Sequence, residues 1–208
     1  MDRAVQALVG GGCVVYPTET FYALGALVGS PSALARVNTI KGRPRSKPLP
    51  VIVGGMEQLG QVMSADAASW PGYAVAMLLM ERFWPGPLSI IVPAAKGLPP
   101  QLLDGRGSVS VRFTPHSQAQ ELCLKAGSPL AATSANVSGE PSVSDVGRLS
   151  PAVCLGADYV LAGDPAPAGG LASTVVRPLA NGEAYVYRVG ALPLEEIERV
   201  GVILRREE

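Results

Sequence analysis

Hydrophobic and polar positions alternate along the chain in short segments, some with helical spacing and some with strand spacing. Apolar residues recur at helical spacing over residues 2–9, and three glycines follow, which predicts a helix that ends there. The next apolar run, residues 13–16, is short and stops at Pro17, as expected for a strand. Residues 108–113 alternate strictly, with serines and Arg112 on the polar face, and this pattern predicts a half-buried strand.

The same reading assigns most of the remaining chain. Further helices are expected over residues 30–40, 57–63, 74–83, 117–126 and 194–200, and further strands over residues 49–53, 88–92, 129–132, 159–161, 174–176 and 184–189. Strands alternate with helices early and cluster late, which favours an α/β fold with a mixed parallel and antiparallel sheet flanked by helices. No internal repeat or long linker divides the chain, so we expect one domain over residues 1–208.

Composition narrows the classes of function. Of 208 residues, 48% are hydrophobic, which is enough for a sizeable core, and Gly (24) and Pro (19) imply many turns. Seventeen basic residues balance seventeen acidic ones, which excludes a globally basic nucleic-acid coat protein. The N-terminal segment has no long apolar stretch, and the longest apolar run, residues 74–80, is too short to span a membrane. We therefore expect a cytoplasmic protein with no membrane partner.

Cysteine and histidine chemistry is sparse. Cys13, Cys123 and Cys154 are widely spaced and form neither a CxxC pair nor a disulfide framework, so reduced thiols are expected. The one histidine, His116, cannot by itself build a metal site or a Ser-His-Asp triad. The chain also lacks the GxxxxGK[ST], GxGxxG and HExxH motifs. Chemistry that rests on cations and hydroxyls fits nucleotidyl or phosphoryl transfer.

A local excess of positive charge is the first candidate binding feature. Residues 20–56 contain no acidic residue, and the segment KGRPRSK (41–47) carries four cations: Lys41, Arg43, Arg45 and Lys47. Glycine and proline are expected to keep the segment extended, so that Lys41 and Arg43 point the same way and hold a polyphosphate. A solvated basic loop is the alternative. As an exposed cation, Lys41 is expected to contribute little to folding, so Lys41→Ala should lower turnover far more than thermal stability.

Two polar segments that follow apolar strands are further candidates. In TSANVSGEPS (133–142), Ser134 and Asn136 supply a hydroxyl and an amide at the end of a strand, where α/β proteins place ligand loops. An ordinary turn is the alternative interpretation. In PTETFYALG (17–25), the threonines after the strand suit either turn caps or ligand contacts, and nothing local decides between the two.

Six ordered segments together resemble the YrdC-like threonylcarbamoyl-AMP synthases. They cover about residues 5 to 190, and they read PTETFYALG, IKGRPRSKPL, WPGPLSIIV, SVSVRF, PLAATSANVSGEPS and ASTVV. The resemblance implies a twisted mixed sheet around a basic concave cavity, in a short, single-domain form of the family. It also implies that L-threonine, bicarbonate and ATP give threonylcarbamoyl-AMP and pyrophosphate. The product would serve a downstream threonylcarbamoyl-transferase complex that forms N6-threonylcarbamoyladenosine at position 37 of tRNAs reading ANN codons.

The resemblance also implies roles for twelve residues. A catalytic constellation would fall on Lys41, Arg43, Ser134 and Asn136, which also bind ATP. Further ATP contacts are implied for Lys47, Ser142 and Arg188. Threonine contacts are implied for Thr20, Tyr22, Arg112, Thr133 and Ser173. Arg112 is attractive on its own account, because a cation alone on the polar face of a strand suits the threonine carboxylate.

A divalent metal, Mg²⁺, is expected with ATP and would be held by phosphate oxygens, with no protein ligand that can be named.

Many members have Gly after the Tyr of the first motif, where this chain has Ala23, a feature shared with a branch of uncertain activity. Two alternatives stand beside the synthase. The basic segment also suits a module that binds tRNA or double-stranded RNA, and Ala23 suits a divergent relative that acts on a different substrate.

Overall fold

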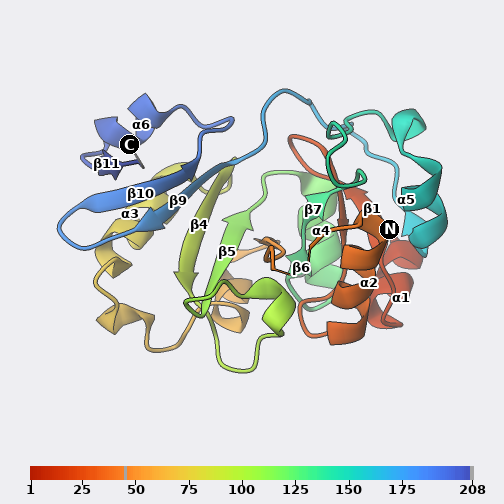
Figure 1. The fold of residues 1–208 in the computed structure, drawn as a ribbon, viewed down its shortest axis with the longest axis horizontal. Coiled ribbons are helices and arrows are strands. Elements are labelled where there is room, and N and C mark those ends of the chain that lie inside the picture. The colour runs from red at the N-terminus through yellow and green to blue at the C-terminus, as the bar shows by residue number, and fades with distance from the viewer. Residues whose placement is uncertain (45, 207–208) are drawn as a thin grey trace.

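Strand pairing divides the chain between two sheets (Figure 1). In the computed structural model, which describes residues 1–44 and 46–206, one sheet has the order β7-β2-β1-β8 and the other has the order β11-β10-β9-β4-β5-β3-β6. Arg45, one of the four cations of KGRPRSK, lies outside the described residues. The strands are β1 (Val14–Pro17), β2 (Tyr22–Gly25), β3 (Val51–Val53), β4 (Leu88–Pro93), β5 (Ser108–Phe113), β6 (Leu130–Ala131), β7 (Thr133–Ser134), β8 (Tyr159–Val160), β9 (Thr174–Pro178), β10 (Glu183–Arg188) and β11 (Ile203–Arg205).

Helices flank the sheets, as the sequence predicts. They are α1 (Asp2–Val9), α2 (Pro31–Lys41), α3 (Tyr73–Phe83), α4 (Ser117–Lys125), α5 (Pro151–Gly156) and α6 (Leu194–Arg199), with 3-10 turns at Met56–Gln61, Ala67–Ser69, Pro100–Leu102 and Val146–Arg148. Within the described part of the chain, no helix has the length and apolar character needed to cross a membrane.

Both sheets are mixed, which confirms the predicted fold class. In the larger sheet, β5 runs parallel to β3 and antiparallel to β4, and β4 runs parallel to β9. The strand expected over residues 129–132 is present as β6, which pairs with β3, and an unexpected short strand, β7, follows it and pairs with β2 of the other sheet. The chain therefore crosses from one sheet to the other at Ala132. This crossing carries the polar segment that begins at Thr133.

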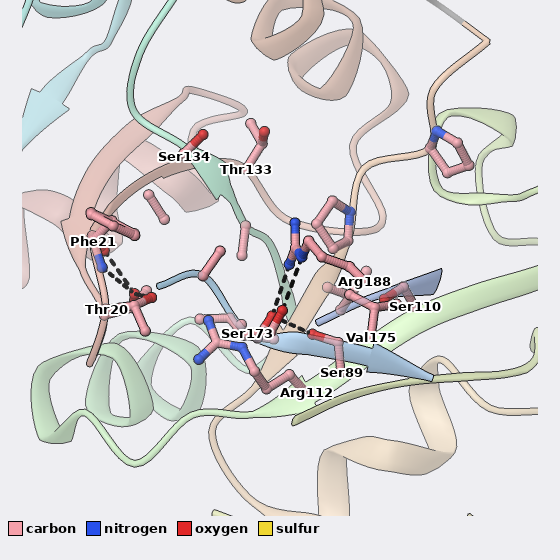
Figure 2. Close-up of a pocket in the computed structure, with 18 of the residues that line it drawn as sticks. Thr20, Phe21, Ser89, Ser110, Arg112, Thr133, Ser134, Ser173, Val175 and Arg188 are labelled. Atoms are coloured by element: carbon pink, nitrogen blue, oxygen red, sulfur yellow. Dashed lines mark hydrogen bonds between the residues drawn. The ribbon is translucent and has the colours of Figure 1, made fainter. Parts of the chain in front are cut away.

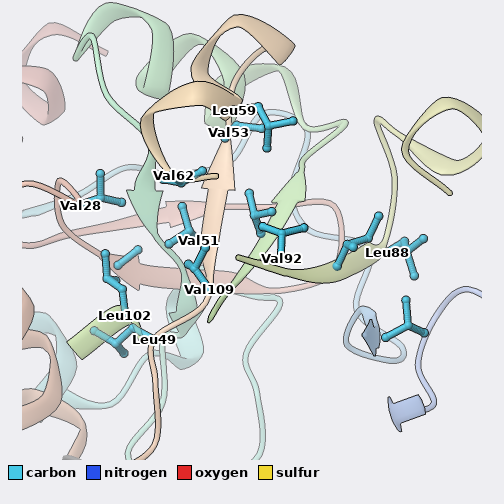
Figure 3. Close-up of a cluster of buried hydrophobic side chains, with 14 of the residues drawn as sticks. Val28, Leu49, Val51, Val53, Leu59, Val62, Leu88, Val92, Leu102 and Val109 are labelled. Atoms are coloured by element: carbon cyan, nitrogen blue, oxygen red, sulfur yellow. The ribbon is translucent and has the colours of Figure 1, made fainter. Parts of the chain in front are cut away.

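Strand β3, which lies between β5 and β6 in the larger sheet, is buried on both faces. Val51 and Val53 belong to the main hydrophobic cluster, and Ile52, on the opposite face, belongs to a second cluster that includes Leu8 of α1 and Leu122 of α4. Figure 3 shows valines and leucines gathered around β3, β4 and β5 in the main cluster. Apolar side chains on both faces explain why this strand reads as a continuous hydrophobic run.

Most predicted elements are present, with a few differences. The helix expected over residues 57–63 is a 3-10 helix, and β2, α5 and β11 were not expected. β2 is missed because the motif PTETFYALG reads as one strand and a loop, whereas β1 and β2 form an antiparallel hairpin across it.

The expected extended conformation of KGRPRSK is wrong at its start. Helix α2 continues through Lys41 and ends at Gly42, whose φ of 58° is in the left-handed region that glycine favours. The backbone N–H of Arg43 donates to the carbonyl of Asn38 in the last turn. Because the chain turns at Gly42, Lys41 and Arg43 make different contacts instead of converging side by side on one ligand.

Candidate functional site

A cavity of about 420 Å³ is lined by residues of both sheets. The β1–β2 turn, β2 and β7 contribute from the smaller sheet, and β3, β4, β5, β9 and β10 contribute from the larger one. Figure 2 shows Thr133 and Ser134 on one side of this space, with Arg112, Ser173 and Arg188 on the other. Nine of the twelve residues predicted for the site line the cavity: Thr20, Tyr22, Arg43, Arg112, Thr133, Ser134, Ser142, Ser173 and Arg188.

Three guanidinium groups make the cavity attractive to anions. Arg43, Arg112 and Arg188 all line it, from three separate segments of the chain. Desolvation lowers the pKa of Arg112 to about 10. Desolvation also lowers the pKa of Arg43 and of Arg188, and the charge of Arg43 lowers that of Arg188 further. Since neighbouring cations destabilise one another, an entering anion would relieve this repulsion.

Hydrogen bonds fix two of these arginines. Arg188 donates from Nε to the carbonyl of Ser173 at 2.9 Å and from Nη2 to its hydroxyl at 3.1 Å. The hydroxyls of Ser173 and Ser89 lie 2.9 Å apart, which links Arg188 to strand β4 (Figure 2). Arg43 donates to the carbonyls of Lys47 and Pro48, at 3.2 Å and 3.0 Å. A guanidinium held by neutral acceptors keeps its positive charge available to a ligand.

Arg112 has a different partner. As the sequence predicted, Arg112 is the one cation on its strand, and the structure adds an ion pair with Glu19 from the β1–β2 turn. The other carboxylate oxygen of Glu19 accepts a hydrogen bond of 3.0 Å from Thr114. Arg112 is buried, with 7% of its surface exposed, and its strand β5 lies between β4 and β3 in the larger sheet.

Comparison with known proteins assigns the fold. The family model Sua5_yciO_yrdC, described as "Telomere recombination", matches residues 6–190. The chain belongs to the Sua5/YciO/YrdC family. A threonylcarbamoyl-AMP synthase of Pyrococcus abyssi is 35% identical over 190 residues, which are 91% of this chain and 54% of that protein. The chain thus spans about half the length of this relative.

Two solved structures of the family are similar throughout the chain. The P. abyssi Sua5 structure with L-threonine superposes with a TM-score of 0.86 at 33% identity and covers 97% of this chain and 58% of that one. Escherichia coli YciO superposes with a TM-score of 0.80 at 25% identity and covers 94% and 91% of the two chains. The predicted membership of this family is confirmed.

Lys41 lies behind the cavity wall of this family member. It is 2% exposed, and its ammonium nitrogen donates to the carbonyl of Asn136 at 2.6 Å, to the carbonyl of Ser134, and to the Asn136 side-chain oxygen at 3.4 Å. Burial, more than the nearby charge of Arg43, lowers the pKa of Lys41 to about 8. The expectation that Lys41 is an exposed cation is therefore wrong.

The side chain of Asn136 adds further hydrogen bonds to the loop that Lys41 contacts. Its amide donates to the carbonyls of Val137 and Glu140, at 3.0 Å and 2.6 Å, which closes the loop after β7. The backbone N–H of Ser138 in turn donates to the carbonyl of Lys41 at 2.8 Å. Asn136 and Lys41 do not line the cavity, and neither does the exposed Lys47. Lys41 and Asn136 instead hold the segment that presents Thr133 and Ser134.

Several polar residues of the wall were not among the predicted ones. They are Thr18, Ser89, Asp104, Ser108 and Ser110. A signal was present for Ser110, which shares the polar face of its strand with Arg112. No sequence pattern marked Ser89 as a site residue, because it lies in an apolar run. Its position in the wall is evident only from its contact with Ser173.

The histidine and the three cysteines do not line the cavity. His116 is buried, and its Nε2 lies 2.9 Å from the carbonyl of Pro165. The three cysteines are free, with Cys13 and Cys123 buried and Cys154 exposed. Among the residues described, no group of three or more His, Cys, Asp or Glu side chains is placed to hold a metal ion. The donors of the cavity are guanidinium and hydroxyl groups, which suit phosphate and carboxylate oxygens.

Proposed function

We propose that this chain is a threonylcarbamoyl-AMP synthase, an enzyme of nucleotidyl transfer that uses L-threonine, bicarbonate and ATP. The observation that carries the proposal is a single cavity in which three arginines face hydroxyl groups, in a chain whose relative is named for this activity. The L-threonine bound to the P. abyssi relative supports the amino-acid part of the proposal.

The reaction joins two condensations. The threonine amine and bicarbonate give a carbamate with loss of water. A carbamate oxygen then attacks the α-phosphorus of ATP, and the bond to the bridging oxygen breaks as pyrophosphate leaves. Negative charge accumulates on the phosphate oxygens in this step, so fixed cations lower its barrier.

We assign the arginines to the two substrates by their surroundings. Arg43 and Arg188 lie close enough for their charges to interact, and both are held by neutral acceptors, so they would bind the triphosphate. Arg112 is buried between the sheets and would bind the threonine carboxylate. Hydroxyls of the wall would orient the oxygens of both substrates. The candidates are the hydroxyl residues that the resemblance implies and that line the cavity: Thr20, Thr133, Ser134, Ser142 and Ser173.

Lys41 and Asn136 would act as positioning residues, because their contacts are with the loop after β7. Lys47 is exposed and outside the wall, so its contact with the nucleotide stays a prediction from the resemblance. Mg²⁺ would supply charge neutralisation from the phosphate side, because the wall offers cations and hydroxyls in place of a carboxylate cage.

The test is threonine-dependent release of pyrophosphate from ATP in the presence of bicarbonate and Mg²⁺. Arg43→Gln is expected to raise the KM for ATP at least tenfold, since a charge-assisted hydrogen bond contributes about 1.5–3 kcal/mol. The matched control is Arg148→Gln, which removes an exposed arginine that does not line the cavity. Absence of threonine-dependent release from the unaltered protein would refute the proposal.

The same assay separates the alternatives. Release that depends equally on serine and other amino acids would favour a divergent relative with a different substrate. Salt-sensitive binding of tRNA or double-stranded RNA without pyrophosphate release would favour an RNA-binding module.

The proposed product would be passed to a separate transferase that modifies adenosine 37 of ANN-reading tRNAs, in the cytoplasm.

A further inference from the structure

We infer that Glu19 is a positioning residue for the amino acid, because it orients Arg112 toward the carboxylate of the substrate. The inference rests on the proposed function, in which Arg112 binds the threonine carboxylate. It assigns a task to an acidic residue whose neighbours Thr18 and Thr20 line the cavity.

The ion pair joins the two sheets. Glu19 follows β1 of the smaller sheet, and Arg112 is on β5 near the middle of the larger one. Backbone bonds hold the turn that carries Glu19, because its carbonyl accepts from Ala168 and that of Thr20 accepts from Gly169 at 2.7 Å. Both ends of the pair are therefore anchored in the fold, and the side chain of Glu19 is 17% exposed.

The pair occupies one end of the guanidinium and leaves the other open. Glu19 contacts Arg112 through Nη1. Among residues 1–44 and 46–206, neither Nε nor Nη2 of Arg112 has a hydrogen-bond partner, although Arg112 lines the cavity. Those two nitrogens form the planar fork that binds a carboxylate through two parallel bonds.

The carboxylate of Glu19 is itself held in one orientation. Thr114 is fully buried and donates to the oxygen of Glu19 that does not face Arg112, at 3.0 Å. The Thr114 hydroxyl also accepts from the backbone N–H of His116 at 3.2 Å, which sets the direction in which it donates. A chain of contacts thus runs from the backbone of His116 through Thr114 and Glu19 to Arg112.

Arg112 pairs with an acid, whereas Arg43 and Arg188 are held by neutral carbonyl and hydroxyl oxygens, and the net charge of the pair explains this difference. The Glu19–Arg112 pair has no net charge, so it does not compete with Arg43 and Arg188 for the polyphosphate. It still offers a directed fork, and a zwitterionic amino acid suits such a neutral pair better than a polyanion does. The pair therefore divides the cavity into a region for the nucleotide and a region for the amino acid.

The test compares steady-state kinetics of the unaltered protein with those of Glu19→Gln. We expect the KM for threonine to rise at least tenfold while the KM for ATP changes less than twofold. A purely structural role would move both constants together or move only stability. An unchanged or lower KM for threonine would overturn the inference. Absence of activity in the unaltered protein would count against the proposed function instead.

Two further variants keep the test decisive if Glu19→Gln folds poorly. Thr114→Val conserves shape and removes the hydroxyl that donates to Glu19 and accepts from the backbone N–H of His116. We expect a rise of about threefold in the KM for threonine, and no rise would overturn the inference. Asp158→Asn is the matched control, because Asp158 pairs with Arg36 away from the cavity. It is expected to leave both KM values unchanged. An equal rise in the KM for threonine would overturn the inference, because general destabilisation would then explain the effect of Glu19→Gln.

Discussion

The ammonium nitrogen of Lys41 lies 2.6 Å from the backbone carbonyl of Asn136, 95 positions further along the chain. This contact joins the end of helix α2 to the loop that follows β7. The backbone N–H of Ser138 bonds back to the carbonyl of Lys41, so the tie runs in both directions. The start of the segment KGRPRSK is thus tied to the loop behind the cavity wall, and its Arg43 lines the cavity itself.

Lys41→Ala is expected to lower the free energy of unfolding by about 2–4 kcal/mol, because it leaves buried carbonyl oxygens without a donor. Chemical denaturation measures this change. Lys47→Ala is the matched control from the same segment, and removal of an exposed lysine should alter stability by less than ~0.5 kcal/mol. Equal stability of the two variants would show that the Lys41 contacts carry no weight in folding.

Stability should rise with pH in the alkaline range because of the same lysine. Its pKa is about 8 in the folded protein, below the ordinary value of 10.5, so between these values the unfolded state binds more protons. The free energy of unfolding should therefore increase from pH 8 to pH 10.5 by at most ~3 kcal/mol from this group. Denaturation at several pH values should show a smaller increase for Lys41→Met, and parallel curves for the two proteins would contradict the prediction.

Ser173→Ala should weaken the binding of ATP. The variant removes the hydroxyl that accepts from Arg188 at 3.1 Å and leaves the bond from Arg188 to the backbone carbonyl in place. Since one of two hydrogen bonds is lost, at about 1 kcal/mol, the KM for ATP should rise about fivefold. Ser69→Ala provides a control, because Ser69 is exposed and does not line the cavity. An unchanged KM for ATP would show that the bond from Arg188 to the Ser173 hydroxyl does not contribute to ATP binding.

Gly25→Ala should be strongly destabilising. A Cβ at Gly25 in β2 would overlap the carbonyl oxygen of Ala131 in β6, where the two sheets approach each other. Because backbone would have to move, we expect a loss of more than about 2 kcal/mol or an insoluble protein. Gly29→Ala is the control, since a Cβ there meets nothing within 4 Å. Similar melting temperatures for the two variants would disprove the close approach.

The alternation of Ser110 and Arg112 with valines correctly predicted a strand with one polar face. No local pattern could show that Glu19, 93 positions away, would supply the partner of Arg112, because an ion pair between a turn of one sheet and a strand of the other depends on how the two sheets pack. The error over Lys41 has a similar origin. Glycine and proline in KGRPRSK suggested an extended chain, but Gly42 serves to end a helix in the left-handed conformation.

Hydrophobic periodicity by itself determined the element types, the mixed α/β class and the segments that carry polar chemistry, because these depend on neighbours a few positions apart. The division into two sheets, the burial of Lys41 and the meeting of Arg43, Arg112 and Arg188 in one cavity were decided only by the tertiary structure. Side chains distant in the sequence acquire their partners, and hence their charge and direction, only when the strands that carry them pack together.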